Sequence, residues 1–386
     1  MKKVFLFLVS FFLAFFLVCM LPSFGQPVNQ SSETDIKSEM KFLKKDVKDL
    51  KERLAEEENK TRNNNALSSG ISDLEVSGGI SGGYFYASNP GKETSDNKFL
   101  LSNFLVEISS EKKGRPLGFV AAFGETSTPS LFDAPEINSN YDIEYASLSL
   151  KPVSDLTLKA GLLMPAAGYE DTYTFNNRNI VTGALASQQP YNAYGARVIY
   201  SVSGIDLLAG YYKSRLDDQE YCTAGKCPDD SWELGLGGTA SGLDFHVFNY
   251  HLNGMRNLTG VVIEHTIKNI HLAFNVDYWK WNSSMRNTYG GRSSIGAAFY
   301  LSPRFGKISV PLRIEYIDQG RSRIYTESTA AKHIYAATLT PTYNFSEHAY
   351  ARVGGAYISA DRAFQDKSGN VKDGRIYLSA ELGLLF

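Results

Sequence analysis

The sequence is poor in the residue types that carry most enzymatic and metal chemistry. Its 386 residues include 3 cysteines and 6 histidines, and no histidine stands in a recognisable catalytic pattern with Ser or Asp. Lys and Arg number 39 against 41 Asp and Glu, which leaves no basic excess for a nucleic-acid partner. We therefore expect no enzyme activity, no catalytic residues, no metal, no cofactor and no nucleic acid.

Long apolar runs are also missing after residue 21, and the mean hydropathy is −0.23. A membrane helix needs about 18 or more consecutive apolar residues, so none is expected there. Aromatic residues nevertheless make up 13% of the chain, with 23 Tyr and 23 Phe, and there are 33 Gly. This composition is typical of a transmembrane β-barrel.

The N-terminus predicts export from the cytoplasm. Lys2 and Lys3 precede an apolar run that ends at Leu21, and small residues follow at a cleavage site before Gln26. Residues 1–25 are therefore predicted to be a signal peptide. The alternative is an uncleaved membrane anchor, since the apolar run is somewhat long for a signal.

A heptad pattern follows the predicted cleavage site. Residues 26–35 form a polar linker, 36–60 a predicted coiled-coil helix, and 61–72 a second linker. The coiled-coil seam consists of Ile36, Met40, Leu43, Val47, Leu50 and Leu54. Three heptads are marginal alone, so we expect the helix to be stabilised within an oligomer, a homotrimer. A single amphipathic helix or a partly disordered arm is the alternative.

From residue 73 to the end the pattern has the period of two that a β-strand requires. Along the last strand, Ile376, Leu378, Ala380, Leu382, Leu384 and Phe386 alternate with mostly polar residues. We expect the apolar face to contact lipid and the polar face to contact water. The strand around Tyr145 alternates poorly. The chain-terminal Phe386 resembles the signal that the barrel-assembly machinery recognises.

Turn signals allow the strands to be counted. Seven short turns and eight longer connections divide residues 73–386 into sixteen strands of about 20 residues each with their connection, within a range of 14 to 18. The predicted fold is all-β, an antiparallel transmembrane β-barrel preceded by a short periplasmic coiled-coil helix. Pro311 and Pro341 fall inside predicted strands, where we expect a shared β-bulge.

Charged residues on the polar faces are candidates for the pore lining, because they cannot face hydrocarbon cheaply. The strands contribute Lys159, Arg197, Glu264, Arg313, Glu315 and Arg352. The long segment 165–189 adds Glu170, Asp171 and Arg178, and is expected to fold into the lumen. The alternatives are strand charges at the rim or paired with one another, and an outward flap. Trp279 and Trp281 suggest an interfacial aromatic girdle or a sugar-stacking step.

Two cysteines, Cys222 and Cys227, flank a short loop segment. In an oxidising compartment this pair predicts a disulfide that orders one loop. A zinc half-site is the alternative, but no histidine lies nearby.

One module of the predicted barrel resembles a known family. Tyr141-Asp-Ile-Glu-Tyr145, Leu156-Thr-Leu-Lys-Ala-Gly161, Gly168-Tyr-Glu170, Pro190 and Tyr194-Gly-Ala-Arg197-Val-Ile-Tyr200 are similar to the OmpL-like β-barrel porins. The resemblance implies a general diffusion channel over about 73–386, in a bacterial outer membrane with its lipid and lipopolysaccharide as partners. A sugar-selective porin and a structural anchor tethered through the coiled coil are the alternatives.

Overall fold

The computed structural model describes residues 74–92, 94–110, 116–127, 130–135, 141–213, 230–252, 255–283, 286, 291–326, 328 and 330–386. The predicted signal peptide, both linkers, the coiled-coil helix and the Cys222–Cys227 pair lie outside these residues. Everything described belongs to one unit, Asp73–Phe386.

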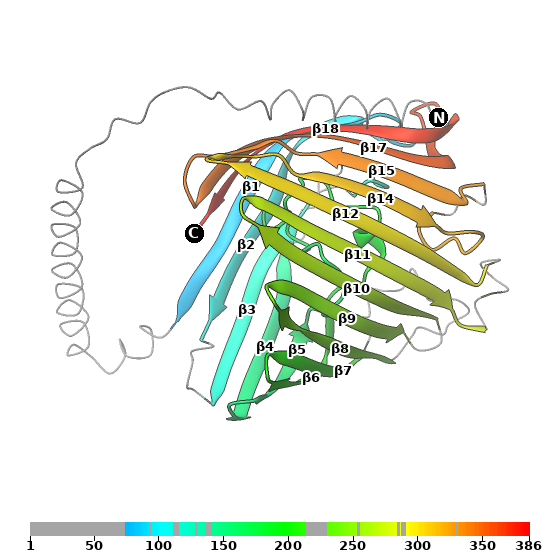
Figure 1. The fold of residues 1–386 in the computed structure, drawn as a ribbon. Coiled ribbons are helices and arrows are strands. Elements are labelled where there is room, and N and C mark those ends of the chain that lie inside the picture. The colour runs from blue at the N-terminus through cyan, green and yellow to red at the C-terminus, as the bar shows by residue number, and fades with distance from the viewer. Residues whose placement is uncertain are drawn as a thin grey trace, which may run out of the picture. The chain divides into compact units, whose positions relative to one another are not determined.

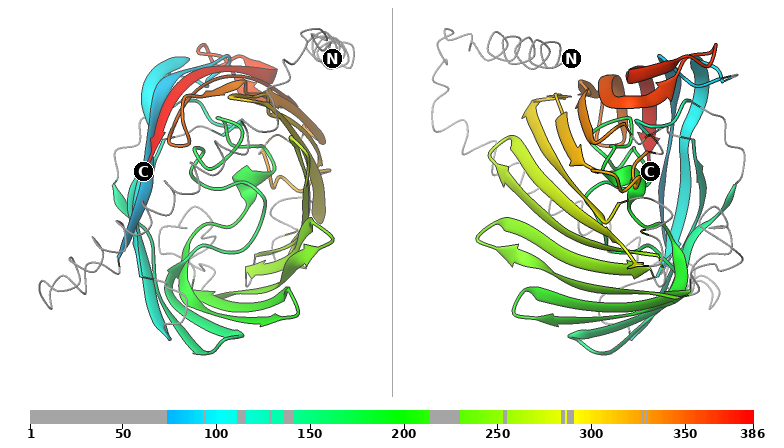
Figure 2. Two further views of the ribbon diagram at one scale, coloured as in Figure 1. Left: turned by 60° about the vertical axis from the view of Figure 1, so that its left-hand side comes forward. Right: turned by 90° about the vertical axis from the view of Figure 1, so that its right-hand side faces the viewer.

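The described residues form one antiparallel sheet that closes on itself (Figures 1 and 2). Its strands are β1 (Glu75–Ala87), β2 (Asn97–Ser109), β3 (Leu117–Thr126), β4 (Asp142–Val153), β5 (Leu156–Leu163), β6 (Ala193–Val202), β7 (Ile205–Lys213), β8 (Asp230–Ala240), β9 (Leu243–Leu252), β10 (Arg256–Ile267), β11 (Ile270–Trp281), β12 (Ser293–Phe305), β13 (Ile308–Ser309), β14 (Leu312–Asp318), β15 (His333–Leu339), β16 (Thr342–Asn344), β17 (Ala349–Gln365) and β18 (Val371–Leu385). Consecutive strands pair with one another, except that the segments β13 and β14, and likewise β15 and β16, follow end to end and pair with the strands on either side. β1 pairs with β18, so the sheet is a barrel without a free edge.

The 18 assigned segments in the described part of the chain amount to sixteen strands, as the sequence predicted. β13 and β14 are two parts of one strand, as are β15 and β16, and the breaks fall at Pro311 and Pro341. The expected β-bulge is absent from these described strands. Ser309 pairs with Thr342 and Leu312 with Leu339, so neither strand gains a residue across the gap. The prolines interrupt the hydrogen bonding without shifting the register, because they lack only the N–H donor.

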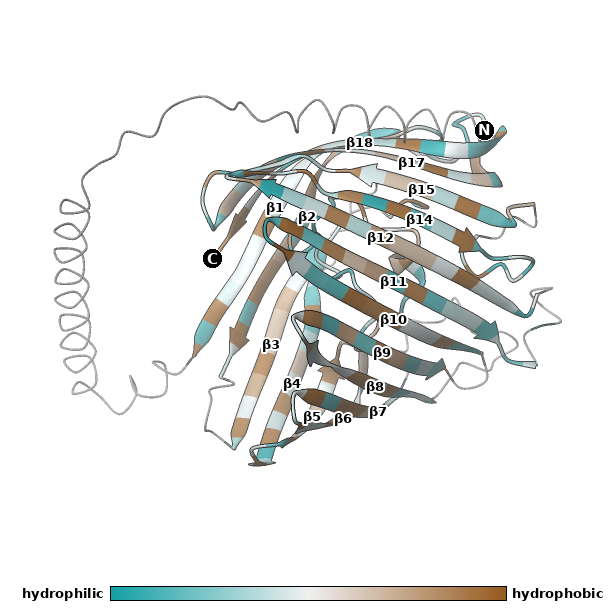
Figure 3. Ribbon diagram, in the orientation of Figure 1, coloured by the Kyte–Doolittle hydropathy of each residue, from teal (hydrophilic) through white to brown (hydrophobic). Residues whose placement is uncertain are grey.

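The two faces of the barrel have the polarity expected for a wall between lipid and water. On β18, Ile376 and Leu378 are 48% and 52% exposed, whereas Tyr377 and Glu381 are 1% and 3% exposed. Brown and teal residues alternate along the strands in Figure 3. Phe386 lies at the closing seam, where its backbone exchanges two hydrogen bonds with Gly78 of β1.

A β-bulge explains why the strand around Tyr145 alternates poorly. Ala122 pairs with Tyr145 but the next residue, Phe123, pairs with Ile143, so Glu144 is the extra residue of β4. The insertion reverses the faces of the residues on either side of it. The Tyr145 hydroxyl then donates a hydrogen bond to Glu107.

Inward aromatic rings lie over glycines of the adjacent strand. Phe248 pairs with Gly260, and Tyr350 pairs with Gly383. A Cβ at Gly260 would lie 2.1 Å from Phe248 Cζ, and one at Gly383 would lie 2.1 Å from Tyr350 Cζ. The rings therefore cover bare backbone, which accounts for part of the high glycine and aromatic content of the chain.

Short turns and long connections alternate along the chain. Ser203-Gly204 and Ser241-Gly242 have positive φ at both positions, the geometry of the tight turn that suits twisted hairpins. The long connections, including residues 164–192 between β5 and β6, lie at the opposite end of the barrel. The connection between β17 and β18 is short for this end of the barrel, since β17 continues to Gln365 and β18 begins at Val371.

Candidate functional site

The connection between β5 and β6, residues 164–192, turns into the barrel and is here called the lumen loop. Its green ribbon crosses the interior in both views of Figure 2. It contains one short helix, η1 (Ala186–Gln188), and its side chains Tyr173, Ile180 and Leu185 are 2%, 0% and 0% exposed. The sequence had left an outward flap as the alternative, and the burial of these residues excludes that arrangement.

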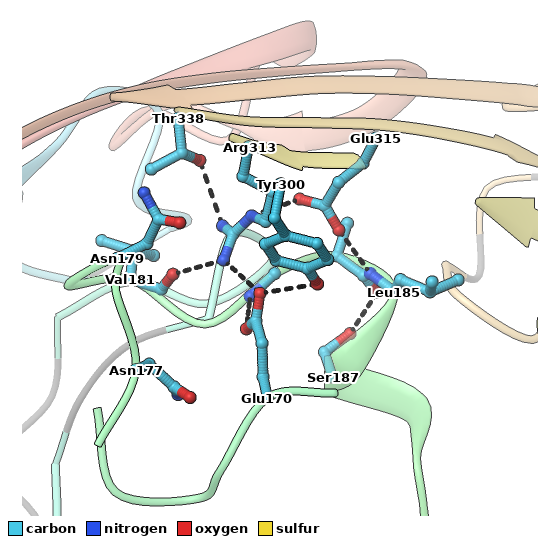
Figure 4. Close-up of polar contacts among 12 residues, drawn as sticks. Glu170, Asn177, Asn179, Val181, Leu185, Ser187, Tyr300, Arg313, Glu315 and Thr338 are labelled. Atoms are coloured by element: carbon cyan, nitrogen blue, oxygen red, sulfur yellow. Dashed lines mark hydrogen bonds and ion pairs between the residues drawn. The ribbon is translucent and has the colours of Figure 1, made fainter. Parts of the chain in front are cut away.

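Arg313 of β14 is the main contact between the lumen loop and the barrel wall (Figure 4). Its Nη1 donates to Glu170 Oε1 at 2.6 Å and to the Val181 carbonyl at 2.9 Å. Its Nη2 donates to the Thr338 hydroxyl at 3.0 Å, and its Nε lies 3.0 Å from Glu315 Oε2. The guanidinium is fully buried, so each of these contacts replaces a lost contact with water.

The two carboxylates around Arg313 are also bound to the backbone. Glu170 Oε2 accepts a hydrogen bond from the Gly183 N–H at 2.8 Å, and its Oε1 accepts one from the Tyr300 hydroxyl at 3.0 Å. Glu315 Oε1 accepts a hydrogen bond from the Leu185 N–H at 2.8 Å. One arginine and two glutamates therefore hold three separate parts of the loop against the wall.

Arg352 of β17 forms a second contact between wall and loop. Its Nε pairs with Glu381 of β18. Its Nη1 and Nη2 donate to the carbonyls of Asn177 and Thr174 at 3.1 and 3.0 Å. The guanidinium lies 4.9 Å from the centre of the Tyr350 ring. A wall carboxylate thus balances the charge while the remaining donors bind the loop.

Arg197 of β6 holds the beginning of the loop in the same way. Its Nη2 lies 3.0 Å from Glu233 Oε2 and donates to the Met164 carbonyl at 2.6 Å. Glu233 also accepts hydrogen bonds from the Tyr212 hydroxyl and the Ala166 N–H. All three contacts share one design, in which an inward arginine is paired with a wall glutamate and bound to a loop carbonyl.

These three arginines were predicted to line a water-filled pore. Arg313 and Arg352 are 0% and 4% exposed, and the side chain of Arg197 is 11% exposed. The structure therefore encloses them between loop and wall instead of leaving them free in the lumen, because the loop carbonyls compete successfully for their donors. Glu315 and Glu170 are enclosed with them.

The other two charges of the lumen loop differ from Glu170 and from each other. Asp171 is used within the loop, where Oδ1 accepts from the Tyr173 N–H and Oδ2 from Asn176 Nδ2, at 2.9 and 3.0 Å. Arg178 is exposed and borders a cavity. Of the loop's three charged side chains, all within the described residues, Arg178 is thus the one presented to solvent.

The remaining strand candidates lie on the inner face at other points of the wall. Lys159 of β5 is partly buried and pairs across the strands with Arg197. Glu264 of β10 is 38% exposed, and its Oε2 lies 3.6 Å from His271 Nε2 on β11. The structure therefore separates Lys159 and Glu264 from the network around Arg313.

Two cavities lie next to the lumen loop. The larger, about 630 Å³, extends toward the short turns, where Asn344 and Glu347 line it. The smaller, about 170 Å³, lies toward the long connections, where Ser130 and Asn192 line it. Glu170 lines both cavities, so the Arg313 network lies where the two cavities approach each other.

Apolar packing closes part of the interior around the loop. Leu131, Val181, Leu185, Ile317 and Tyr325 belong to one buried cluster that joins two further connections to the lumen loop and the wall. Each of them is at most 4% exposed. Part of the lumen near the long connections is therefore filled by side chains instead of water.

Trp279 and Trp281 do not form the interfacial girdle predicted for them. Both are 2% exposed and lie on the inner face of β11. Arg256 stacks 4.2 Å from the Trp279 ring and 5.8 Å from the Trp281 ring, and Trp281 Nε1 donates to the Ser322 carbonyl at 2.6 Å. Alternation places both rings on the inner face, beside polar neighbours. There Trp281 binds the connection that contains Ser322.

Sequence reasoning missed several members of this site. Glu233 and Glu381 are the wall partners of two arginines, and Arg375 donates to the carbonyls of Asn89 and Phe132 in two other connections. All three occupy inward positions of their strands, so alternation alone could have identified them as inward. It could not have paired them with their partners.

Comparisons with known proteins agree with this architecture. Residues 73–386 match the family model described as "Putative beta-barrel porin-2, OmpL-like". The outer-membrane protein OmpT of Vibrio cholerae is similar in structure, with a TM-score of 0.53, 11% identity, and coverage of 81% of this chain and 97% of that one. A mutant porin of Rh. blastica has a TM-score of 0.51, 13% identity, and coverage of 81% and 100%. No match was found among curated protein sequences.

Two kinds of feature are absent from the described residues. Among them, no helix is long and apolar enough to span a membrane. No group of three or more His, Cys, Asp or Glu side chains within the same residues is arranged to hold a metal ion.

Proposed function

This chain belongs to the OmpL-like β-barrel porin family, and from that premise we propose that it is a passive outer-membrane channel for small hydrophilic solutes or ions. The observation that best supports this function is the position of the lumen loop. A connection of 29 residues, numbers 164–192, is folded into the barrel and fastened at three arginines, with cavities on both sides of Glu170. A loop bound in this way narrows a channel, because it occupies lumen that the wall alone would leave to water.

The outer wall supports a membrane setting. Large apolar residues such as Leu378, Leu382 and Leu384 are at least half exposed, at 52%, 64% and 50%. In water such a surface would aggregate, whereas acyl chains would cover it. With the signal peptide expected at residues 1–25, the proposal places the barrel in a bacterial outer membrane and residues 26–72 in the periplasm.

Planar-bilayer recording tests the channel directly. The purified full-length barrel, reconstituted at low concentration, is expected to produce stepwise conductance, and the reversal potential in a salt gradient will report its ion preference. A correctly folded, inserted barrel without conductance would contradict the channel and favour the anchoring role.

We also propose a homotrimer held by barrel contacts and by the Ile36–Leu54 seam. The seam lies outside the described residues, and its a-type positions do not themselves select three chains over two. Native mass spectrometry in detergent should show trimers that dissociate when residues 36–60 are removed. Monomer alone, with the arm intact, would contradict this oligomer.

The loop disulfide is a separate proposal, since Cys222 and Cys227 also lie outside the described residues. Peptide mapping without reduction should recover them as one linked peptide. Two alkylatable thiols in protein purified from the outer membrane would exclude the disulfide.

A further inference from the structure

The large cavity carries two opposite charges that the loop-anchoring network does not use. Arg178, at the bend of the lumen loop, is exposed and borders the cavity of about 630 Å³. Glu170 is bound to Arg313, and Asp171 is bound within the loop, so neither carboxylate is presented to a solute in the cavity. The loop therefore presents one cation to whatever enters the cavity from the side of the short turns.

The wall of the same cavity presents an anion. Glu264 of β10 borders the cavity with its side chain 38% exposed, and its Oε2 lies 3.6 Å from His271 Nε2. Asp244 pairs directly with Glu264 across β9 and β10, which adds negative charge to this part of the wall. Carboxylates side by side at the edge of a water-filled space attract a cationic group.

Arg178 and Glu264 line the same cavity without forming an ion pair. His271 lies beside Glu264 on the neighbouring strand. Among the described residues, however, no ion pair within 4.0 Å links Arg178 to either of them. Two opposite charges on the lining of one cavity, out of contact with each other, leave room for a solute that carries both complementary charges.

Aromatic surface completes the cavity. Tyr169 and Tyr300 lie with ring centres 4.3 Å apart, and both line it together with Phe175. The volume lies within the range of about 300–1,000 Å³ typical of small-molecule sites. The cavity thus offers an apolar wall beside a separated pair of charges.

We propose that this cavity is a binding subsite for small zwitterions, the class that includes amino acids and short peptides. Arg178 binds the carboxylate by charge-assisted hydrogen bonds, Glu264 binds the ammonium group, and the aromatic wall contacts the side chain. The inference rests on the proposed channel function and specifies its solute.

Liposome swelling tests the solute class. Full-length protein in vesicles is challenged with isotonic threonine or with erythritol, an uncharged solute of nearly the same mass. Wild-type vesicles are expected to swell faster in threonine. Glu264→Gln removes the charge at constant size, and Arg178→Gln removes the charge but keeps a shorter polar side chain. Each variant is expected to lower the threonine-to-erythritol ratio about threefold, the scale of a partly exposed ion pair.

Two further variants control the experiment. Asp206→Asn removes a carboxylate outside this cavity and should leave the ratio unchanged. The charge-swapped pair Arg178→Glu with Glu264→Arg should recover the preference that either single reversal loses. If the folded wild-type protein gives neither swelling nor conductance, the channel itself is refuted. Conductance with equal swelling in both solutes, or a preference unaffected by Arg178→Gln and Glu264→Gln, would refute the zwitterion subsite alone.

Discussion

Glu170 Oε1 lies 2.6 Å from Arg313 Nη1, and this ion pair joins the lumen loop to the inner face of β14. Glu315, two residues after Arg313 on the same strand face, binds the Leu185 N–H of the same loop. One short stretch of β14 therefore holds the loop at two separate positions, Glu170 and Leu185. Substitutions on β14 can therefore change the position of the loop while the barrel stays closed.

Replacing Arg313 by Met should release part of the lumen loop. The side chains of Arg313 and Glu170 are 0% and 3% exposed, and breaking a buried pair from one side costs about 3–5 kcal/mol. We expect new proteolytic cleavage within residues 170–183 and noisier single-channel currents. The matched control is Lys213→Met, which breaks the exposed pair with Asp230 and should change neither measurement.

The double variant Arg313→Met with Glu170→Gln separates pairing from charge. If the ion pair between Arg313 and Glu170 holds the loop, the second substitution should restore part of the protease resistance, because one of the two carboxylates left without Arg313 is then neutral. Resistance to protease in the Arg313→Met single variant would show that apolar packing holds the loop by itself.

Deleting residues 170–180 should raise single-channel conductance and shift ion selectivity. The deletion removes Glu170, Asp171 and Arg178 together with the bulk that occupies the lumen. Replacing residues 366–370, the connection between β17 and β18, by a two-residue turn is the control, and it should leave the conductance unchanged. A folded barrel with unaltered conductance after the first deletion would mean that the loop does not limit flow.

Gly260→Ala should destabilise the barrel, although it adds a single methyl group. Its Cβ would lie 2.1 Å from Phe248 Cζ, so the ring must leave its position on the neighbouring strand. Overpacking of this kind costs about 1–3 kcal/mol. Urea unfolding, followed by the heat-modifiable shift on gels, measures the loss. Gly355→Ala, where the nearest atom is 4.0 Å away, should be neutral, and equal stability of the two variants would contradict the ring-on-glycine argument.

Deletion of Phe386 should lower the yield of barrel in the outer membrane while export across the inner membrane continues. Two effects are combined in that deletion, because the Phe386 backbone also makes two hydrogen bonds with Gly78. Phe386→Ala keeps the backbone and removes only the ring. If the ring is the assembly signal, Phe386→Ala should behave like the deletion. Wild-type yield for Phe386→Ala would assign the effect to closure of the seam.

The sequence by itself determined the wall of this protein. Alternation along Ile376–Phe386 assigned the two faces of β18 correctly, and the turn signals gave the number of strands correctly. Both features are local, because the pleat sets the direction of each side chain and a turn is decided by its own few residues. The poor alternation near Tyr145, which the sequence left without an explanation, follows from the bulge at Glu144.

Only the tertiary structure decided what fills the interior of the barrel. Arg313 and Glu170 are 143 residues apart, and Arg352 and Thr174 are 178 apart, so no spacing in the sequence relates them. Their meeting depends on closure of the barrel, which brings β14 and β17 to the loop that follows β5. Closure also gave the inward arginines loop carbonyls to bind in place of water. The strand pattern could show that these residues face inward, but an inward charge can be solvated or enclosed, and that choice is made by the loop packed against it.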